Sequence, residues 1–199
     1  MRLLAESLSA VRGSRILFRD LSFAVAESEA LVVKGANGSG KTTLLRLLAG
    51  LLSPNAGRIA LADSPEPLAE AVHFVGHLDA LKGALTVGEN LTFYKNLFGG
   101  GGEAVPVALT RVGIGGLAML PAQVLSAGQR RRAALARLLV SQRPVWLLDE
   151  PTNALDADGQ KLLVRLIEEH RGRGGMVIAA THARLELAGV REISLGGDA

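Results

Sequence analysis

The stretch Gly35-Ala36-Asn37-Gly38-Ser39-Gly40-Lys41-Thr42 decides the fold of this chain. It fits the pattern G-x-x-x-x-G-K-[ST], and it lies between an apolar run at residues 30–33 and a helical run at 41–52. A strand, a glycine-rich turn and a helix in this order form a loop whose backbone amides surround phosphates. The alternative, an ordinary glycine turn before a helix, does not require every fixed position of the pattern. The stretch therefore predicts a nucleotide site in an α/β fold.

Each residue type in this loop has a chemical reason. The glycines let the backbone turn so that successive amides point inward, and the helix dipole adds positive potential. We expect Lys41 to contact the β- and γ-phosphates and the hydroxyl of Thr42 to bind Mg²⁺. We assign nucleotide binding to the loop and the residue after it: Gly35, Ala36, Asn37, Gly38, Ser39, Gly40, Lys41, Thr42 and Thr43.

A second apolar run, Val145-Trp146-Leu147-Leu148, ends in two carboxylates, Asp149 and Glu150. Such a run is typical of a buried parallel strand, and ligands bind at the carboxyl ends of these strands. Asp149 suits the Mg²⁺ shell, whereas Glu150 suits the general base that polarises the attacking water. Many strands end in this way, so the run gains its meaning from the phosphate-binding loop upstream. Together the two motifs predict an ATPase.

The rest of the chain alternates between strands and helices, apart from a helical stretch in the middle. Thr86 and Glu89 have the spacing of a capping box, and Gly99–Gly102 interrupts the helix that follows them. The order of elements predicts a mostly parallel α/β core, residues 1–78 and 141–199, and a helical insert, residues 79–140. We expect strands around 2–7, 16–18, 21–25, 30–33, 58–61, 72–75, 145–148, 176–180 and 191–195, and helices over 41–52, from 86, and over 103–112, 129–140 and 160–170.

The composition excludes several classes of protein. Hydrophobic residues make up 48% of the 199 residues, yet they lie in short runs far from the roughly 18 to 20 that a spanning helix needs. The start of the chain is a poor signal peptide, so we expect a cytosolic chain.

The absence of cysteine excludes disulfides and thiolate metal sites. The net charge of +3 gives nucleic-acid binding little support, and the cluster Arg130–Arg132 is expected to solvate a face or brace a subunit interface.

Residues 125–130, Leu-Ser-Ala-Gly-Gln-Arg, narrow the class of ATPase. Ser126 can cap a helix that begins near Gln129, and the amides at that end form an anion site. The stretch resembles the signature motif of the ABC ATPases, with Ala127 where a glycine is usual. The resemblance implies a P-loop NTPase core with an N-terminal antiparallel β region and an inserted helical subdomain. It also implies a homodimer, in which Ser126, Gly128 and Gln129 of one subunit close on the ATP held by the other.

Further motifs follow in the order of this family. Residues 153–156, Asn-Ala-Leu-Asp, resemble the D-loop that crosses the dimer interface. His182 follows a core strand and resembles the switch histidine that contacts the γ-phosphate, although a lone histidine is more often an ordinary surface or core residue. His77 stands where the family has a glutamine that senses Mg²⁺ and the attacking water, so its coupling role is expected and a direct metal contact is left open. Arg12 takes the place of the aromatic residue that stacks on adenine, and a guanidinium can stack on a base as well.

The combination of motifs and length is similar to the ATP-binding subunits of the haem exporter in bacterial cytochrome c biogenesis. This resemblance implies the membrane partners CcmB and CcmC, release of the haem-loaded chaperone CcmE, and a peripheral place on the cytoplasmic face of the inner membrane. We expect neither nucleic-acid binding nor direct haem binding by this chain. The residues leave two alternatives open: the ATPase of another small ABC transporter with a different cargo, and a soluble ABC machine that acts on DNA or ribosomes.

Overall fold

The computed structural model describes residues 1–183 and 185–196 and contains two compact units. The first unit, called the core unit, consists of Met1–Gly76, Pro144–Pro151 and the described residues from Ile167 onward. The second, called the helical unit, consists of His77–Arg143 and Thr152–Leu166. Each unit is described below by itself.

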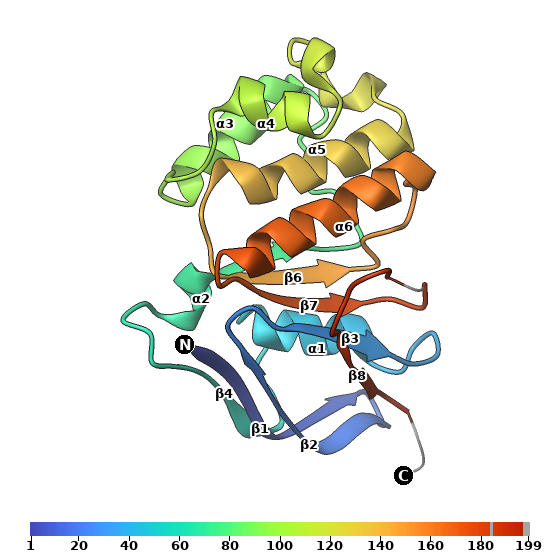
Figure 1. Cartoon of the computed structure of the whole chain (residues 1–199). Coiled ribbons are helices and arrows are strands. Elements are labelled where there is room, and N and C mark those ends of the chain that lie inside the picture. The colour runs from blue at the N-terminus through green and yellow to red at the C-terminus, as the bar shows by residue number, and fades with distance from the viewer. Residues whose placement is uncertain (184, 197–199) are drawn as a thin grey trace. The chain divides into compact units, whose positions relative to one another are not determined.

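The core unit holds every strand that the structure describes, together with two helices and the end of a third (Figure 1). Residues of α6, Ala157–Gly172, belong to both units. The remaining elements of the core unit are β1 (Arg2–Arg12), β2 (Arg15–Ala26), β3 (Ala30–Lys34), α1 (Lys41–Leu48), β4 (Ala56–Ala62), α2 (Leu68–Ala71), β5 (Val72–Val75), β6 (Val145–Asp149), β7 (Met176–Ala180) and β8 (Arg191–Ser194).

A parallel sheet in the order β5-β6-β7-β3-β8 forms the centre of this unit. All residues of β6 and β7 are buried, as expected for apolar runs in a parallel sheet that is covered on both faces. α1 packs against these two strands (Figure 1). Asp149 at the end of β6 is paired with Ala180 at the end of β7. Because parallel strands end at the same edge, the residues that follow both strands meet there.

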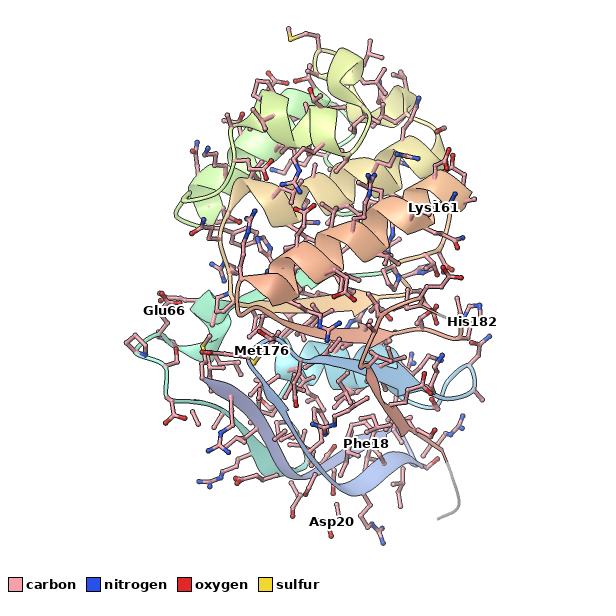
Figure 2. All side chains as sticks on the ribbon, in the orientation of Figure 1. Phe18, Asp20, Glu66, Lys161, Met176 and His182 are labelled. Atoms are coloured by element: carbon pink, nitrogen blue, oxygen red, sulfur yellow. The ribbon has the colours of Figure 1, made fainter. Side chains whose placement is uncertain are left out.

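A smaller antiparallel sheet, in the order β2-β1-β4, forms the second layer of the core unit. Side chains along most of β1 alternate in burial, and Leu3, Leu8 and Phe18 join the core that contains Leu44 and Leu147. Phe18 is labelled in Figure 2. The observed architecture confirms the predicted α/β fold with an N-terminal antiparallel β region.

Several expectations about element bounds were wrong. The first helix ends at Leu48 and does not reach Leu52, because Gly50 adopts a positive φ of 69° that ends the helix. The segments 16–18 and 21–25 form a single strand, β2, with a register irregularity where Asp20 has a φ of 52°. The first strand continues past Ser7 to Arg12. The short helix α2 was not predicted, since four residues carry too little periodicity.

The helical unit contains α3 (Val87–Leu97), α4 (Val105–Arg111), the 3₁₀ turns η1 (Gly115–Leu117) and η2 (Ala122–Val124), and α5 (Ala127–Val140). The predicted capping box is present at α3: the Thr86 Oγ1 accepts from the amide of Glu89, whose carboxylate accepts from the amide of Thr86. The predicted break at Gly99–Gly102 separates α3 from α4. The two 3₁₀ turns were not predicted.

The arginine cluster at the start of α5 corrects one expectation. Arg131 does not solvate a face, because only 3% of its side chain is exposed, and it forms an ion pair with Asp79 at 3.3 Å. Arg137, one and a half turns further along, donates to the carbonyl of Asp79 at 3.1 Å and stacks on the ring of Tyr94. Arg131 and Arg137 therefore hold the segment around Asp79 against α5 within the helical unit.

Within residues 1–183 and 185–196 we find no helix with the length and apolar character required to cross a bilayer.

His170 on α6 is a half-buried titratable group of the core unit. Its ring stacks on Trp146 with the centroids 3.9 Å apart, and its Nε2 lies 3.1 Å from the carbonyl oxygen of Pro144. Burial lowers the pKa of His170 from 6.5 to about 4, while hydrogen bonds to the backbone of Pro144 and Met176 act in the opposite direction. The folded protein thus keeps this ring neutral at pH values where the unfolded chain protonates it.

We expect the free energy of unfolding to fall by about 2 kcal/mol between pH 7 and pH 5 through this residue alone. The sign follows from the lowered pKa: between about 6.5 and about 4 the unfolded state binds the additional proton, so stability decreases as the pH falls. Urea unfolding at both pH values measures the effect. A His170→Phe variant keeps a ring on Trp146 but cannot titrate, and its pH dependence should be smaller by that amount. Equal slopes for wild type and variant would contradict the assignment.

Candidate functional site

The phosphate-binding loop connects β3 to α1 in the core unit. Gly35, Gly38 and Gly40 all have positive φ angles, of 144°, 79° and 102°. At Gly35 a Cβ atom would lie 2.5 Å from both the carbonyl oxygen of Leu195 and the Oγ of Ser39, so a side chain does not fit there. The loop geometry therefore depends on glycine, as the sequence pattern indicates.

Two polar groups of this loop suit a phosphate ligand. The Nζ of Lys41 donates to the carbonyl oxygens of Gly35 and Ala36, at 2.7 and 3.2 Å, so the ammonium lies inside the curve of the loop. The Oγ of Ser39 is buried and has no hydrogen-bond partner among the described residues. α1 begins after Gly40 without a side-chain cap, which leaves its first amides available to an anion. The loop thus fits a chain of phosphates by charge and by donors.

A pair of oxygen-bearing side chains lies next to the loop. The hydroxyl of Thr42, on the first turn of α1, donates to the Oδ2 of Asp149 at 2.9 Å. Asp149 is the last residue of β6 and is only 2% exposed. The helix and the strand thus bring together the two residues that the sequence assigns to Mg²⁺, and hydroxyl and carboxylate oxygens are ligands that this ion prefers.

Glu150 and His182 meet at the same edge of the sheet. The Nδ1 of His182 lies 3.2 Å from Oε1 and 3.1 Å from Oε2 of Glu150. Glu150 has a positive φ of 45° and its amide donates to the carbonyl of Ala180, so β7 fixes its backbone. His182, whose position beyond the end of β7 is visible in Figure 2, is mostly exposed, while Glu150 is mostly covered. A backbone conformation this uncommon for glutamate is frequent at functional sites.

The loop that carries His182 is fixed by its neighbours on β3. The amide of Thr181 donates to the carbonyl of Val33, and the Nζ of Lys34 donates to the carbonyl of Ala183, both at 3.3 Å. The hydroxyl of Thr181 accepts from the amide of Ala183 at 3.0 Å. A neutral imidazole has a single N–H group, so a ring whose Nδ1 donates to Glu150 has Nε2 as an acceptor. Only the imidazolium form has N–H groups at both nitrogens.

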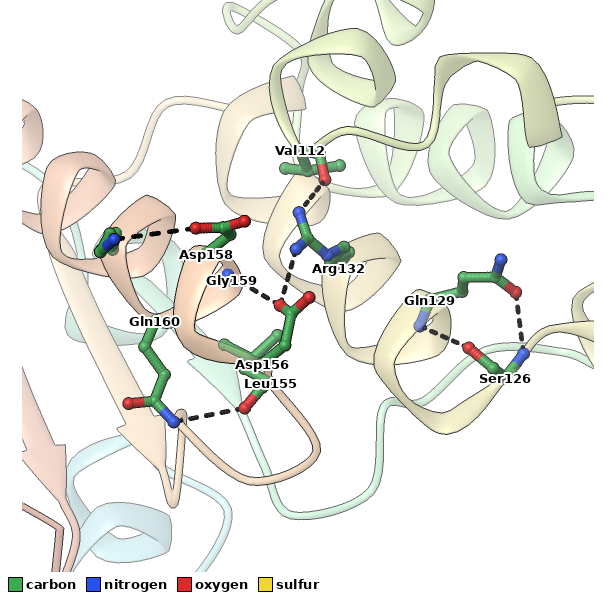
Figure 3. Close-up of polar contacts among 10 residues, drawn as sticks. Val112, Ser126, Gln129, Arg132, Leu155, Asp156, Asp158, Gly159 and Gln160 are labelled. Carbon is green, nitrogen blue, oxygen red and sulfur yellow. Dashed lines mark hydrogen bonds and ion pairs between the residues drawn. The ribbon is translucent and has the colours of Figure 1, made fainter.

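The signature stretch forms the start of α5 in the helical unit (Figure 3). Ser126 is the N-cap: its Oγ accepts from the amide of Gln129 at 3.2 Å, while the Oε1 of Gln129 accepts from the amide of Ser126 at 2.9 Å. This confirms the predicted cap, although the helix begins at Ala127 and not near Gln129. Ser126 is exposed, and its own O–H remains able to donate. Ala127 is an exposed first residue of a helix, a position at which glycine is not required.

The predicted D-loop lies beside this signature stretch in the same unit. A Cβ atom on Gly128 would approach the carbonyl oxygen of Ala154 to 3.0 Å, so the glycine permits close contact between the two segments. Arg132 of α5 donates to the Oδ1 of Asp156 at 2.9 Å and to the carbonyl of Val112 at 3.1 Å (Figure 3). The pKa of Asp156 is lowered, first by the hydrogen bond from the Gly159 amide and then by Arg132.

The structure divides the predicted site residues between the two units. The phosphate-binding loop with Thr43, Asp149, Glu150 and His182 belongs to the core unit, as does Arg12 at the end of β1. His77, Ser126, Gly128 and Gln129 belong to the helical unit. The pairing of Arg132 with Asp156 was not predicted from the sequence. In the sequence this pair is visible only as an acidic residue at the N-terminus of one helix and an arginine on another helix. Contacts between separate elements cannot be derived from the spacing of residues along the chain.

Comparison with known proteins supports the resemblance. The family model for the ABC transporter matches residues 18–153, which is more than half of the chain. The cytochrome c biogenesis ATP-binding export protein CcmA of Rhizobium meliloti is 50% identical over 204 residues, which cover 99% of both chains. The CcmA protein of Rhodopseudomonas palustris strain BisB18 is 52% identical over 201 residues and the full length of both.

Among solved structures, the ATP-binding subunit of an ABC transporter superposes with a TM-score of 0.82 at 23% identity, over 92% of this chain and 80% of that one. A likeness at this identity shows the fold alone. The sequence matches confirm that the chain is an ATP-binding and ATP-hydrolysing protein of the class that the motifs indicated. The chain belongs to the ABC transporter family and, within it, to the cytochrome c biogenesis ATP-binding export proteins CcmA.

Proposed function

We propose that this chain drives a haem export step of c-type cytochrome assembly by binding and hydrolysing ATP at the edge of its parallel sheet. The observation that carries the proposal is the convergence of Lys41, Thr42, Asp149, Glu150 and His182 within the core unit. Lys41 and the loop amides bind the β- and γ-phosphates, and Thr43 continues the same row of donors. Arg12 stacks on the adenine base.

Mg²⁺ is proposed to bind between the nucleotide and the pair Thr42 and Asp149. The Oγ1 of Thr42 and the Oδ2 of Asp149 lie 2.9 Å apart, so these two oxygens would hold the ion. When bound, the ion neutralises charge on the β- and γ-phosphates.

Glu150 is proposed to orient and deprotonate the attacking water, and His182 to stabilise the γ-phosphate. The backbone amide of Glu150 donates to the Ala180 carbonyl and its carboxylate contacts His182, so both parts of the residue have a partner at this edge of the sheet. His182 links the base to the phosphate, because one ring nitrogen contacts Glu150 and leaves the other for the nucleotide. His77, in the position of the family's glutamine, is proposed to report the state of the nucleotide to the helical subdomain, residues 79–140.

The active form is proposed to be a homodimer with two nucleotides at its interface. Ser126, Gly128 and Gln129 of one subunit complete the phosphate site of the other, because Ser126 retains a hydroxyl donor and the start of α5 carries a positive partial charge. Binding of ATP closes the dimer and hydrolysis opens it, which is a switch driven by different affinities of the two states.

The partners are proposed to be integral membrane subunits of the cytochrome c biogenesis system, CcmB and CcmC. The relatives' names contain both "cytochrome c biogenesis" and "export", which is why we assign this chain to that process. A chain with this role works at the cytoplasmic face of the inner membrane and is held there by its partners.

The test in cells is a haem-stained gel of membranes from a strain that lacks this chain. We expect c-type cytochromes to disappear, to return with the wild-type chain, and to remain absent with Lys41→Ala, because export requires bound ATP. An immunoblot controls for equal amounts of both chains. Persistence of c-type cytochromes in the deletion strain would refute the role in their assembly and would favour an ABC transporter with another cargo.

A further inference from the structure

The hairpin between β1 and β2 places two arginines opposite each other. Arg12 is the last residue of β1 and pairs with Arg15, the first residue of β2, across the turn Gly13-Ser14. Directly opposed residues of an antiparallel pair extend from the same face, and like charges in this arrangement are destabilising. Within residues 1–183 and 185–196, neither guanidinium forms a hydrogen bond or an ion pair. The pair therefore lacks an anion that would offset its repulsion.

The same hairpin lies against the phosphate-binding loop. A Cβ atom on Gly38 would lie 3.6 Å from the Nη1 of Arg15, so this guanidinium is next to the backbone of the loop. Further along β2, a Cβ atom on Gly40 would lie 3.0 Å from the Cβ of Leu17 and 3.3 Å from the ring of Phe18. Phe18 is buried in the core, so the packing of β2 on the loop places the backbone of Arg15, on the same strand, near the loop.

We propose that Arg15 is a phosphate-binding residue of the nucleotide site. Arg12 and Arg15 together form a positively charged side of that site, and a bound nucleotide neutralises their charge. The inference rests on the proposed function, since the anion is the ATP held by the loop. A guanidinium is always charged and its fork of donors matches phosphate oxygens, so it suits this place better than a neutral side chain. Its neighbour Gly38 belongs to the loop whose amides surround the phosphates.

The two arginines divide the nucleotide between them. Arg15 faces the loop and contacts the phosphates, which are common to all nucleoside triphosphates. Arg12 lies opposite Arg15 in the hairpin and is the residue assigned to the adenine base. Loss of Arg15 therefore weakens every nucleoside triphosphate equally, whereas loss of Arg12 changes the preference for one base over another.

The experiment measures binding of a fluorescent ATP analogue to the full chain, with competition by unlabelled ATP and GTP. We expect Arg15→Gln to weaken both ATP and GTP about tenfold, the usual size of a lost charge-assisted hydrogen bond. Arg15→Lys keeps the charge and should recover part of the affinity. The matched control is Arg19→Gln, which removes an exposed arginine from the same strand and should leave binding unchanged.

A melting curve without nucleotide separates this role from a structural one. Arg15→Gln relieves the repulsion between the opposed arginines, so its Tm should equal or exceed that of the wild type. A lower Tm together with weaker binding overturns the proposal, because the residue then acts through the fold. An effect on ATP but not on GTP also overturns it, because Arg15 then contacts the base.

Failure of the inference is distinguishable from failure of the proposed function. If wild type binds the analogue, Lys41→Ala does not, and Arg15→Gln binds like the wild type, Arg15 has no role and the nucleotide site remains. If the wild type binds no nucleotide at all, both the proposed function and the inference are wrong.

Discussion

Lys41→Ala is expected to weaken ATP binding by about two orders of magnitude. The Nζ of Lys41 lies inside the curve of the loop, 2.7 Å from the carbonyl oxygen of Gly35, where it meets the phosphate chain. The change removes a buried ammonium that makes charge-assisted hydrogen bonds, and each of these contributes about 1.5 to 3 kcal/mol. Isothermal titration with Mg-ATP measures the loss.

The control for this prediction is Lys161→Ala. Lys161 is an exposed lysine of α6 whose ion pair with Asp158 is 3.8 Å long and contributes little to stability. The Lys161→Ala variant should bind ATP with the affinity of the wild type. A Lys41→Met variant keeps most of the side-chain volume and shows whether a loss of binding comes from the charge or from packing. Near-normal affinity in both Lys41 variants would exclude this lysine from phosphate binding.

Glu150→Gln is expected to lower steady-state ATP hydrolysis at least about a hundredfold while ATP binding persists. An amide retains the shape of the side chain and a hydrogen bond to His182, but it cannot accept a proton from the attacking water, and general base catalysis contributes about 10² to 10⁴ in rate. Because hydrolysis opens the proposed dimer, this variant should accumulate as an ATP-bound dimer. Phosphate release gives the rate, and size-exclusion chromatography with and without ATP gives the oligomeric state.

Two comparisons decide the assignment of Glu150. Glu70→Gln changes an exposed carboxylate on the first turn of α2 and should hydrolyse ATP at the wild-type rate. Lys41→Ala should remain monomeric with ATP, because it does not retain the nucleotide. Turnover of Glu150→Gln at the wild-type rate would remove Glu150 from the mechanism, and a slow variant that stays monomeric would contradict the proposed dimer switch.

Local patterns predicted the elements that carry the site. The loop at residues 35–42 and the apolar run before Asp149 are short and contiguous, so their chemistry and conformation can be derived from residue types alone. The caps at Thr86 and Ser126 were predictable for the same reason, since a capping box joins residues three positions apart. The helix after the loop was predicted too long, because the positive φ of Gly50 ends it within an apolar run.

The sequence by itself determined the nucleotide loop, the two carboxylates after the buried strand and the class of protein, because each is encoded by neighbouring residues. Only the tertiary structure decided which distant side chains meet. It placed His182 against Glu150, because β6 and β7 are adjacent and end together. It also buried Arg131 against Asp79 and brought Arg15 to the loop at Gly38. Such contacts depend on strand order and helix packing, which spacing along the chain does not specify.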